Sequence, residues 1–553
     1  MIADRLVDLV FRFRHWICAL IAVGFVLLAP LFNFTRIDNE ISMWVSKSDP
    51  IYRTYEQFRT EFGGQRKLLI ALQSDRLFTR ESLEFVRSVT EEIQRVDLVE
   101  SVQSLSTANV VRSLPARDGE DSGLEVRPLL DEDLSAAGAP DRVRQRVVSD
   151  SLLRGDLVSD DGTVTAIVVS FDEDRIDDVR GAIIDRIHGL IDPRLPAGMH
   201  GFYNGSLEIS ETYNRITLEN TEKLTPPILV LTVAGIFFMF RSWRITGLLV
   251  VAVIVSMVWT MGLFAAMGFE YNVLASMLPP LVIILAIADD VHIVQHFNHE
   301  LRETGSKEIA FKSSVRHLFT PLLGASATTA LGLASLATSN VVAVRSFGIG
   351  AGVGVMVDFI MSLVLVPSLL MLLKPESGTA PQERYLIGPM QAVARFSMNY
   401  ARTVLAVTFG ILAIGMVGLI WLHVDTNHIN FFPADHPLHR SADVIDRKLS
   451  GIYSFNVLLE GPPDSMKTPD TLRRMEQLRQ RLQQLPYVRK VTSLADYVKR
   501  VNRELGGGAE TAAVLPAAPR RSPRNCSSSS SPTTGARSCR PSPRATFRAH
   551  RCR

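Results

Sequence analysis

The chain alternates long apolar stretches with long polar ones. Windows of about 20 mostly apolar residues, the length that spans a bilayer, occur at seven places: 15–34, 224–240, 245–267, 273–295, 320–338, 347–373 and 401–422. The first window follows Arg12 and Arg14, as in a signal peptide, but it is long enough to span and no small-residue cleavage site follows it. We therefore expect seven transmembrane helices, the first of them uncleaved.

The polar segment between the first and second spans, residues 38–222, shows strands and helices in alternation. KLLIAL and TVTAIVVSF have the composition of buried strands, whereas TRESLEFVRSVTEEIQRV has the apolar spacing of an amphipathic helix. Two strand-helix-strand units of this kind predict an α+β domain.

Arginine and lysine gather in alternate loops between the spans. Arg241 and Arg244 follow the second span, and larger groups follow the fourth and sixth: Arg302, Lys307, Lys312, Arg316, Lys374, Arg384, Arg395 and Arg402. Cytoplasmic loops of membrane proteins carry an excess of these residues. The pattern predicts a cytoplasmic N-terminus and an α+β domain that faces away from the cytoplasm.

The end of the chain repeats its beginning. RIDNEISMWVSKSDP aligns with HVDTNHINFFPADHP, so that Asp38 matches Asp425 and Pro50 matches Pro437, at a constant spacing of 387 residues. Further on, TRESLEFVRSVTEEI aligns with TPDTLRRMEQLRQRL at a spacing of 389. The seventh span therefore corresponds to the first, and a second α+β domain begins after it.

The composition changes abruptly at about Gly506. The last 48 residues contain nine arginines, no lysine, one acidic residue and a run of serines, and such a sequence does not supply a core. Two interpretations remain open, a natural disordered tail and an out-of-frame translation that begins where the repeat is expected to continue.

These patterns together predict an α-helical polytopic membrane protein with α+β domains, divided into seven parts. The parts are the N-terminus with the first span (1–37), the α+β domain (38–222), a five-helix membrane unit (223–374), a cytoplasmic connector (375–400), the seventh span (401–423), the start of a second α+β domain (424–505) and the tail (506–553).

The overall composition agrees with a mixed chain and excludes several classes of function. Hydrophobic residues make up 47% of the chain, and 59 basic residues balance 57 acidic ones, so nothing points to a nucleic-acid partner. Four cysteines, none within the α+β segments, provide neither a disulfide framework nor a metal site there. We find no Walker loop for ATP and no paired nucleophile and base, and we expect neither a cofactor nor an enzyme.

The fourth span carries two adjacent carboxylates, Asp289 and Asp290, in an otherwise apolar helix. An ionised side chain there costs about 2.5 to 3.5 kcal/mol even on a mild scale, so such residues usually face a polar cavity or hold a proton. Burial and mutual repulsion both disfavour full ionisation. The apolar window extends beyond the pair to Gln295, which argues against a helix end, and we predict that the pair takes up and releases protons.

The same helix carries a polar stripe. Asp289, His292, His296 and His299 follow one another at spacings of 3, 4 and 3 residues, which places them on one face. One acid and two histidines are a geometrically possible metal site. We favour instead a polar path from mid-span to the cytoplasm, with His292 as an accessory proton relay, and we expect no metal.

The fifth and sixth spans add further polar groups. Ser326, Thr328 and Thr329 cluster on the fifth span, where hydroxyls can carry a proton path or return their hydrogen bonds to the helix backbone. Asp358 is a third intramembrane carboxylate, for which a relay role and a partnership with a neighbouring hydroxyl are both open. Close helix packing, rather than a phosphate loop, is predicted for four glycines of the sixth span: Gly348, Gly350, Gly352 and Gly354.

The layout of one span, an α+β domain, five spans and then a repeat resembles the permeases of the resistance-nodulation-division (RND) superfamily, in particular their MmpL-like and hopanoid-exporter branch. The resemblance covers about residues 1–505, and three segments carry it: ADD at 288–290, ATTALGLASL at 327–336 and GVGVMVDFIMSLVLVPSLL at 352–370. Spans two to six would form the five-helix unit called a sterol-sensing domain.

The resemblance implies the fold and function of an inner-membrane RND exporter. Proton influx through the membrane helices would drive ferredoxin-like porter domains on the periplasmic side, which move lipids or other hydrophobic molecules outward. By position, Asp289 and Asp290 would be the protonation pair, with Thr328 and Thr329 as neighbours, and we place Asp358 in the same relay. The family has a second pseudo-symmetric half, which implies that this chain would be an exporter truncated on its C-terminal side. A homo-oligomer and a partner transporter chain both remain open as partners.

Two other functions remain open. A sterol-sensing-type lipid receptor or regulator would use the same five helices without pumping, and it would not require Asp289. An auxiliary half-transporter would act together with a second multispanning chain.

Overall fold

The computed structural model forms two compact units and describes most of the chain. The first unit comprises residues 1–54 and 210–425 and is helical, and the second comprises residues 55–209 and 426–553 and is α+β. The described residues are 2–33, 37–46, 48–62, 66–113, 124–131, 133–173, 175–372, 383–422, 427–506, 510–515 and 545–551.

The helical unit contains the seven predicted spans. Seven helices of the described chain are long and apolar enough to cross a membrane, and each predicted window overlaps one of them. They are α1 (Ile2–Asn33), α6 (Ser206–Phe240), α7 (Trp243–Ala266), α8 (Leu278–Thr304), α9 (Lys307–Ala334), α10 (Val342–Leu372) and α12 (Ala401–Gly418). The prediction of a multi-pass helical membrane protein is thus confirmed. A further helix, α11 (Glu383–Asn399), precedes α12.

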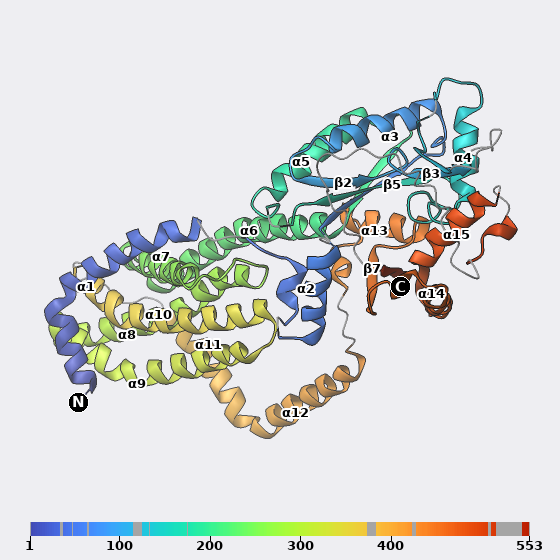
Figure 1. The fold of residues 1–553 in the computed structure, drawn as a ribbon. Coiled ribbons are helices and arrows are strands. Elements are labelled where there is room, and N and C mark those ends of the chain that lie inside the picture. The colour runs from blue at the N-terminus through green and yellow to red at the C-terminus, as the bar shows by residue number, and fades with distance from the viewer. Residues whose placement is uncertain are drawn as a thin grey trace, which may run out of the picture. The chain divides into compact units, whose positions relative to one another are not determined.

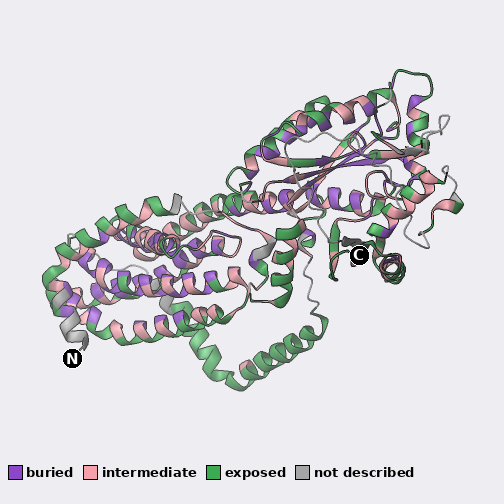
Figure 2. Ribbon diagram, in the orientation of Figure 1, coloured by how far each residue is buried: buried purple, intermediate pink, exposed green. Residues whose placement is uncertain are grey.

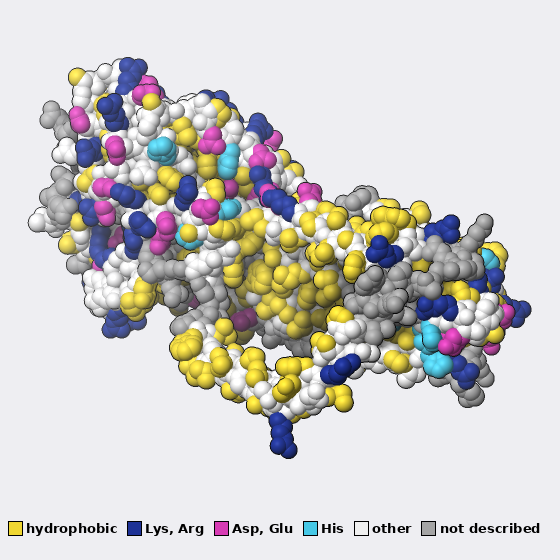
Figure 3. Space-filling view, turned by 180° about the vertical axis from the view of Figure 1, so that it is seen from behind, with side chains coloured by type: hydrophobic (Ala, Val, Ile, Leu, Met, Phe, Trp, Pro, Cys, Tyr) yellow, Lys and Arg dark blue, Asp and Glu magenta, His cyan; other side chains and the backbone are white. Residues whose placement is uncertain are grey.

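Large apolar side chains cover the outside of this unit. Figure 3 shows them as broad yellow areas, and α12 carries several that are more than half exposed, among them Phe409, Ile411 and Ile414. Apolar patches of this extent are stable in contact with lipid rather than water. Figure 2 shows the buried residues of the unit concentrated on α7, α8 and α10.

Helix α10 is the most buried span, and its glycines make this possible. Gly348 and Gly352 face α9 and the turn after it: a Cβ atom would lie 2.8 Å from the Leu333 carbonyl oxygen at Gly348 and 3.1 Å from the Ala330 carbonyl oxygen at Gly352. Only a residue without a side chain lets two helix backbones approach this closely.

The other two glycines of α10 lie on a different face. At Gly350 a Cβ atom would lie 2.5 Å from the Phe264 ring, and at Gly354 it would lie 2.7 Å from the Thr260 methyl group, both on α7. The two interleaved glycine pairs therefore pack against different neighbours, and the predicted close helix packing is confirmed.

The α+β unit is built around a four-stranded antiparallel sheet in the order β2-β5-β1-β6. Its core lies between this sheet and two helices, α3 and α5, which Figure 1 shows on the same face. KLLIAL and TVTAIVVSF form β1 and β5, as predicted, because their apolar side chains are buried between the layers. The strands and helices are β1 (Lys67–Gln73), α3 (Arg80–Ile93), β2 (Val99–Gln103), β5 (Val164–Phe171), α5 (Arg180–Ile191) and β6 (His200–Asn204).

Three more elements complete this part of the chain. A hairpin of β3 (Asn109–Ser113) and β4 (Leu124–Pro128) and the helix α4 (Ala139–Ser149) lie between β2 and β5 in the sequence. Helix α2 (Pro50–Phe62) precedes β1 and crosses the boundary between the two units.

The second copy repeats the first in local structure. The short 3-10 helices Ile41–Trp44 and His428–Phe431 lie 387 residues apart, as do the starts of α2 and α13. Thr79 and Thr468, which lie 389 residues apart, cap α3 and α14 by accepting a hydrogen bond from a backbone N–H. The elements of the second copy are α13 (Pro437–Lys448), β7 (Tyr453–Leu459), α14 (Pro469–Gln483), β8 (Val488–Thr492) and α15 (Leu494–Leu505).

The repeat extends to an uncommon backbone conformation. Leu98 and Tyr487, again 389 residues apart, both have a positive φ, of 65° and 70°, immediately before β2 and β8. Residues with a Cβ atom seldom adopt this region. Its recurrence at matched positions supports the register derived from the sequence.

The two copies also share packing within the α+β unit. Helix α13 of the second copy packs against β6 and covers the second face of the first sheet, where Ile445 and Leu449 contact Ala71, Val164 and Ala166. The first sheet is therefore buried on both faces, once by its own helices and once by the second copy.

Part of the predicted tail forms a strand. Residues Ala545–Arg551 form β9, which pairs antiparallel with β7 and β8 and gives the sheet order β7-β9-β8. In the first copy β5 has the same place between β1 and β2. Residues 507–509, 516–544 and 552–553 of the predicted tail lie outside the described residues.

We expect the repeat to be visible in hydrogen exchange. Replacing an N-cap threonine by alanine costs about 1 kcal/mol, so Thr79→Ala and Thr468→Ala should each speed exchange in the first turn of α3 or α14 by roughly five-fold. Mass spectrometry of the full chain measures this. Ser88→Ala, on the exposed face of α3, is the control, and equal exchange in all three variants would contradict the assigned caps.

The glycine packing of α10 predicts a second outcome. Gly354→Val forces a side chain into the Thr260 methyl group and should lower the free energy of unfolding by about 1 to 3 kcal/mol. Gly332→Val on α9 is the matched control, because no atom lies within 4 Å of its Cβ position. Thermal unfolding of the detergent-purified chain compares them, and equal melting temperatures would refute the close contact.

Candidate functional site

The aspartate pair lies in the middle of the helical unit. Asp289 and Asp290 are neighbours on α8, so their side chains point about 100° apart. Asp290 is only 2% exposed and faces α10, whereas Asp289 is half-buried and faces α9. The two carboxylates therefore have different surroundings, one inside the helix bundle and one at its edge.

A serine of α10 holds the inner aspartate. The Ser362 hydroxyl donates a hydrogen bond of 2.6 Å to Asp290 Oδ1, and both residues are buried. A buried carboxyl group without a donor would be costly. Ser362 therefore stabilises Asp290 at this position between α8 and α10.

Asp358 lies one helical turn before Ser362 on α10 and is 3% exposed. Ser256 of α7 interacts with it, while its Oδ1 atom is buried and has no hydrogen-bond partner among the described residues. The charges of Asp289 and Asp290 also act on this carboxyl group. The structure thus brings the three predicted carboxylates into one cluster, in which simultaneous ionisation of all three is unfavourable.

The fifth span contributes one hydroxyl to the cluster. Ser326 of α9 donates a hydrogen bond of 3.3 Å to Asp289 Oδ2. Thr328 and Thr329 are exposed, and their hydroxyls donate to carbonyl oxygens of their own helix at 2.8 to 2.9 Å. Ser326, rather than either threonine, is the residue of this group that contacts the aspartate pair, and a relay role for the threonines stays a prediction.

The histidines of α8 divide into separate environments. His292 is exposed and near enough to Asp289 for their charges to interact. His296 stacks on His317 of α9, with ring centroids 5.3 Å apart, and its Nδ1 atom lies 3.3 Å from the Ser314 hydroxyl. Within the described part of the chain, no group of three or more histidine, cysteine or acidic side chains is placed to bind a metal.

Two members of the cluster were not identified from the sequence. Ser362 follows Asp358 by four residues and Ser256 lies on α7, and neither stands out among the serines of apolar helices. The helical spacing of Asp358 and Ser362 places them on one face, which is the only signal that the sequence offers. Their contact with α8 depends on how the helices are rotated and packed.

Comparison with known proteins agrees with this architecture. The MMPL family matches residues 46–417. A segment of 232 residues is 26% identical to multidrug resistance protein MdtC of Pectobacterium atrosepticum. The aligned segment covers 40% of this chain and 22% of that protein. A segment of 258 residues is 24% identical to the hopanoid transporter HpnN of Rhodopseudomonas palustris, covering 45% of this chain and 28% of that protein.

Each matched segment thus covers less than a third of the relative's own length. The family match covers most of this chain and ends within the seventh span. The resemblance to RND permeases that the sequence predicted is confirmed: the chain belongs to the MMPL family.

Proposed function

We propose that this chain is part of a proton-driven exporter that moves lipids or other hydrophobic molecules out of the inner membrane. The observation that carries the proposal is the carboxylate cluster: Asp289, Asp290 and Asp358 lie together on two adjacent helices of an apolar bundle. Carboxylates inside a membrane protein usually serve ion or proton movement, because their burial costs free energy and is rare without such a function.

The hydroxyls around the cluster support a relay. Ser326 of α9 donates to Asp289, and Ser362 of α10 donates to Asp290. A proton that reaches the half-buried Asp289 therefore has hydroxyl groups nearby on two neighbouring helices. His292, exposed one turn further along α8, would exchange protons with the cytoplasmic side. Asp358, whose Oδ1 atom has no hydrogen-bond partner in the part of the chain that the structure describes, would be the inner acceptor.

The α+β unit would be the porter domain. The chain order β1-α3-β2-β5-α5-β6 and the sheet order β2-β5-β1-β6 support a ferredoxin-like fold for this domain. The basic loops after the second, fourth and sixth spans support a cytoplasmic N-terminus and a periplasmic α+β unit. The relatives named above are a hopanoid transporter and a multidrug resistance protein, which supports a hydrophobic substrate.

The proposal is tested by proton flux in proteoliposomes that contain the chain, a pH-sensitive dye and an imposed pH gradient. We expect flux that depends on a hydrophobic lipid substrate, and we expect Asp290→Asn and Asp358→Asn to reduce it to the leak of protein-free liposomes. Asp8→Asn, an exposed aspartate paired with Lys312 at 3.3 Å, is the control and should retain the flux.

The same assay separates the alternatives. A lipid receptor would bind lipid without flux, and neither variant would change that binding. A half-transporter would show flux only when a second multispanning chain is present. Full flux in the Asp290→Asn and Asp358→Asn proteins would overturn the relay.

A further inference from the structure

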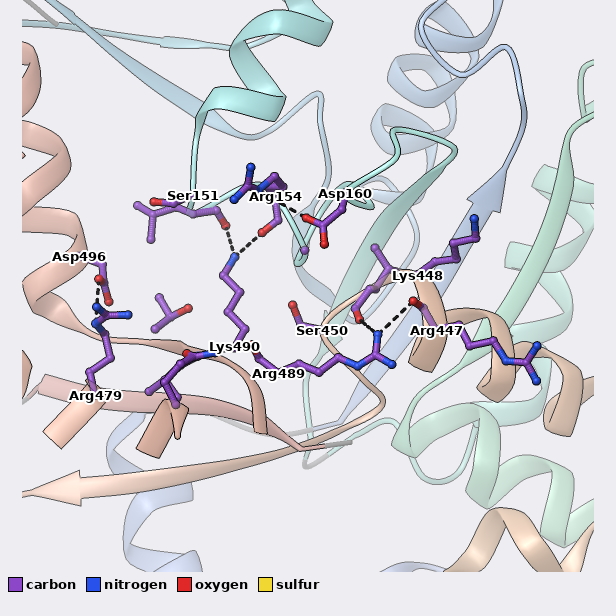
Figure 4. A pocket seen from close by; sticks show the side chains of 16 residues that line it. Ser151, Arg154, Asp160, Arg447, Lys448, Ser450, Arg479, Arg489, Lys490 and Asp496 are labelled. Carbon is purple, nitrogen blue, oxygen red and sulfur yellow. Dashed lines mark hydrogen bonds and ion pairs between the residues drawn. The ribbon is translucent and has the colours of Figure 1, made fainter. Parts of the chain in front are cut away.

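The α+β unit contains a cavity with a strongly basic lining. Its volume is about 460 Å³, within the range of about 300 to 1,000 Å³ typical of small-ligand sites. It opens between the segment Ser151–Asp160 of the first copy and the end of α13, α14 and β8 of the second (Figure 4). Two acidic residues line it, Asp160 and Asp496, against six basic ones: Arg154, Arg447, Lys448, Arg479, Arg489 and Lys490.

Five of the six basic side chains already have a carboxylate within 4 Å. Arg154 lies 3.4 Å from Asp160, and Arg479 lies 3.4 Å from Asp496. The other pairs are Arg447 with Asp443, Lys448 with Asp161, and Lys490 with Asp156. The charge of these five residues is therefore largely balanced by the protein.

One of these pairs, Lys448 with Asp161, holds a lining side chain of the cavity in place. Although burial opposes it, hydrogen bonds from Lys448, Ser159 and Thr163 hold the pKa of Asp161 well below its usual range. Asp161 therefore stays ionised and keeps Lys448 engaged at neutral pH. Lys490 is also fully used, because its ammonium group donates to the Leu152 and Arg154 carbonyl oxygens at 3.1 and 2.6 Å and pairs with Asp156.

Arg489 is the exception. Its Nη1 atom donates to the carbonyl oxygens of Arg447 and Leu449, at 3.0 and 3.4 Å, and these acceptors carry no net charge. In the described part of the chain no carboxylate pairs with it. A guanidinium group has five N–H donors, so a full positive charge and several donors remain at the cavity wall (Figure 4).

Ser450 adds a neutral hydroxyl donor to the lining. It lines the same cavity and is held in place through its backbone, whose N–H donates to the Gly155 carbonyl oxygen at 2.7 Å. Arginine binds phosphate and carboxylate groups through two parallel N–H bonds, and a hydroxyl next to it adds a third contact.

We propose that this cavity binds a single anionic group of phosphate or carboxylate chemistry, with Arg489 as its main ligand and Ser450 as a second donor. Two sources of that group fit, the headgroup of an anionic lipid and a free anion such as inorganic phosphate. The lipid source rests on the proposed export function, whereas the site itself does not. A simpler role for Arg489, which would only cap the end of α13, makes a different prediction.

Equilibrium binding to the purified full chain in neutral detergent tests the site. The probes are inorganic phosphate, short-chain phosphatidylglycerol and short-chain phosphatidylcholine, measured by calorimetry at low and high salt. We expect salt-sensitive binding of at least one anionic probe and none of phosphatidylcholine. Phosphatidylglycerol alone would identify a lipid headgroup, and equal binding of phosphate a free anion.

Variants separate ligand binding from capping. Arg489→Gln should weaken binding at least ten-fold, as expected for a charge-assisted hydrogen bond, and Ser450→Ala, which leaves the α13 cap intact, by roughly five-fold. Arg481→Gln is the matched control, because Arg481 is an exposed arginine of α14 outside the cavity lining. It should bind like the unchanged chain.

Three outcomes would overturn the proposal: no anionic probe binds, binding is the same in all variants, or Arg489→Gln lowers only the melting temperature while Ser450→Ala binds normally. The assay uses no proton gradient, and Asp290→Asn should bind the probe normally. A failure of this site is therefore distinguishable from a failure of the export proposal.

Discussion

The close approach of α10 to its neighbours is the constraint on which the helical unit depends. Gly348 and Gly352 admit the backbone of α9, and Gly350 and Gly354 admit side chains of α7. Since Asp358 and Ser362 lie on the next turns of the same helix, this contact also sets where their side chains meet α8. This packing brings Ser362 of α10 within hydrogen-bonding distance of Asp290 on α8, which lowers the cost of burying that carboxylate.

Hydropathy and charge predicted the spans and the candidate carboxylates because both signals are local. A 20-residue apolar window, or an aspartate inside it, can be recognised without knowing any neighbour. The donors could not be predicted in the same way. Ser362 contacts Asp290 across 72 positions of sequence, and whether Ser326 or Thr328 faces α8 depends on a helix rotation that hydropathy does not specify.

The repeat shows the same division between local and distant structure. Caps and the positive φ of Leu98 and Tyr487 recur at the matched registers, since local sequence determines these features. The sequence did not predict that α13 of the second copy covers the first sheet. A repeat implies two similar folds, but which copy buries which face depends on the apolar surfaces that remain exposed on each.

The functional side chains of the two units have different kinds of partner. In the helical unit Asp289 and Asp290 each accept a hydrogen bond from a neutral serine hydroxyl, that of Ser326 or Ser362. In the α+β unit carboxylates pair with five of the six basic residues that line the cavity, and among the described residues no carboxylate pairs with Arg489. Arg489 uses a single nitrogen for the last carbonyls of α13. An anion can therefore bind its remaining N–H groups while the helix stays capped, and ligand binding does not have to compete with the packing of α13 on the first sheet.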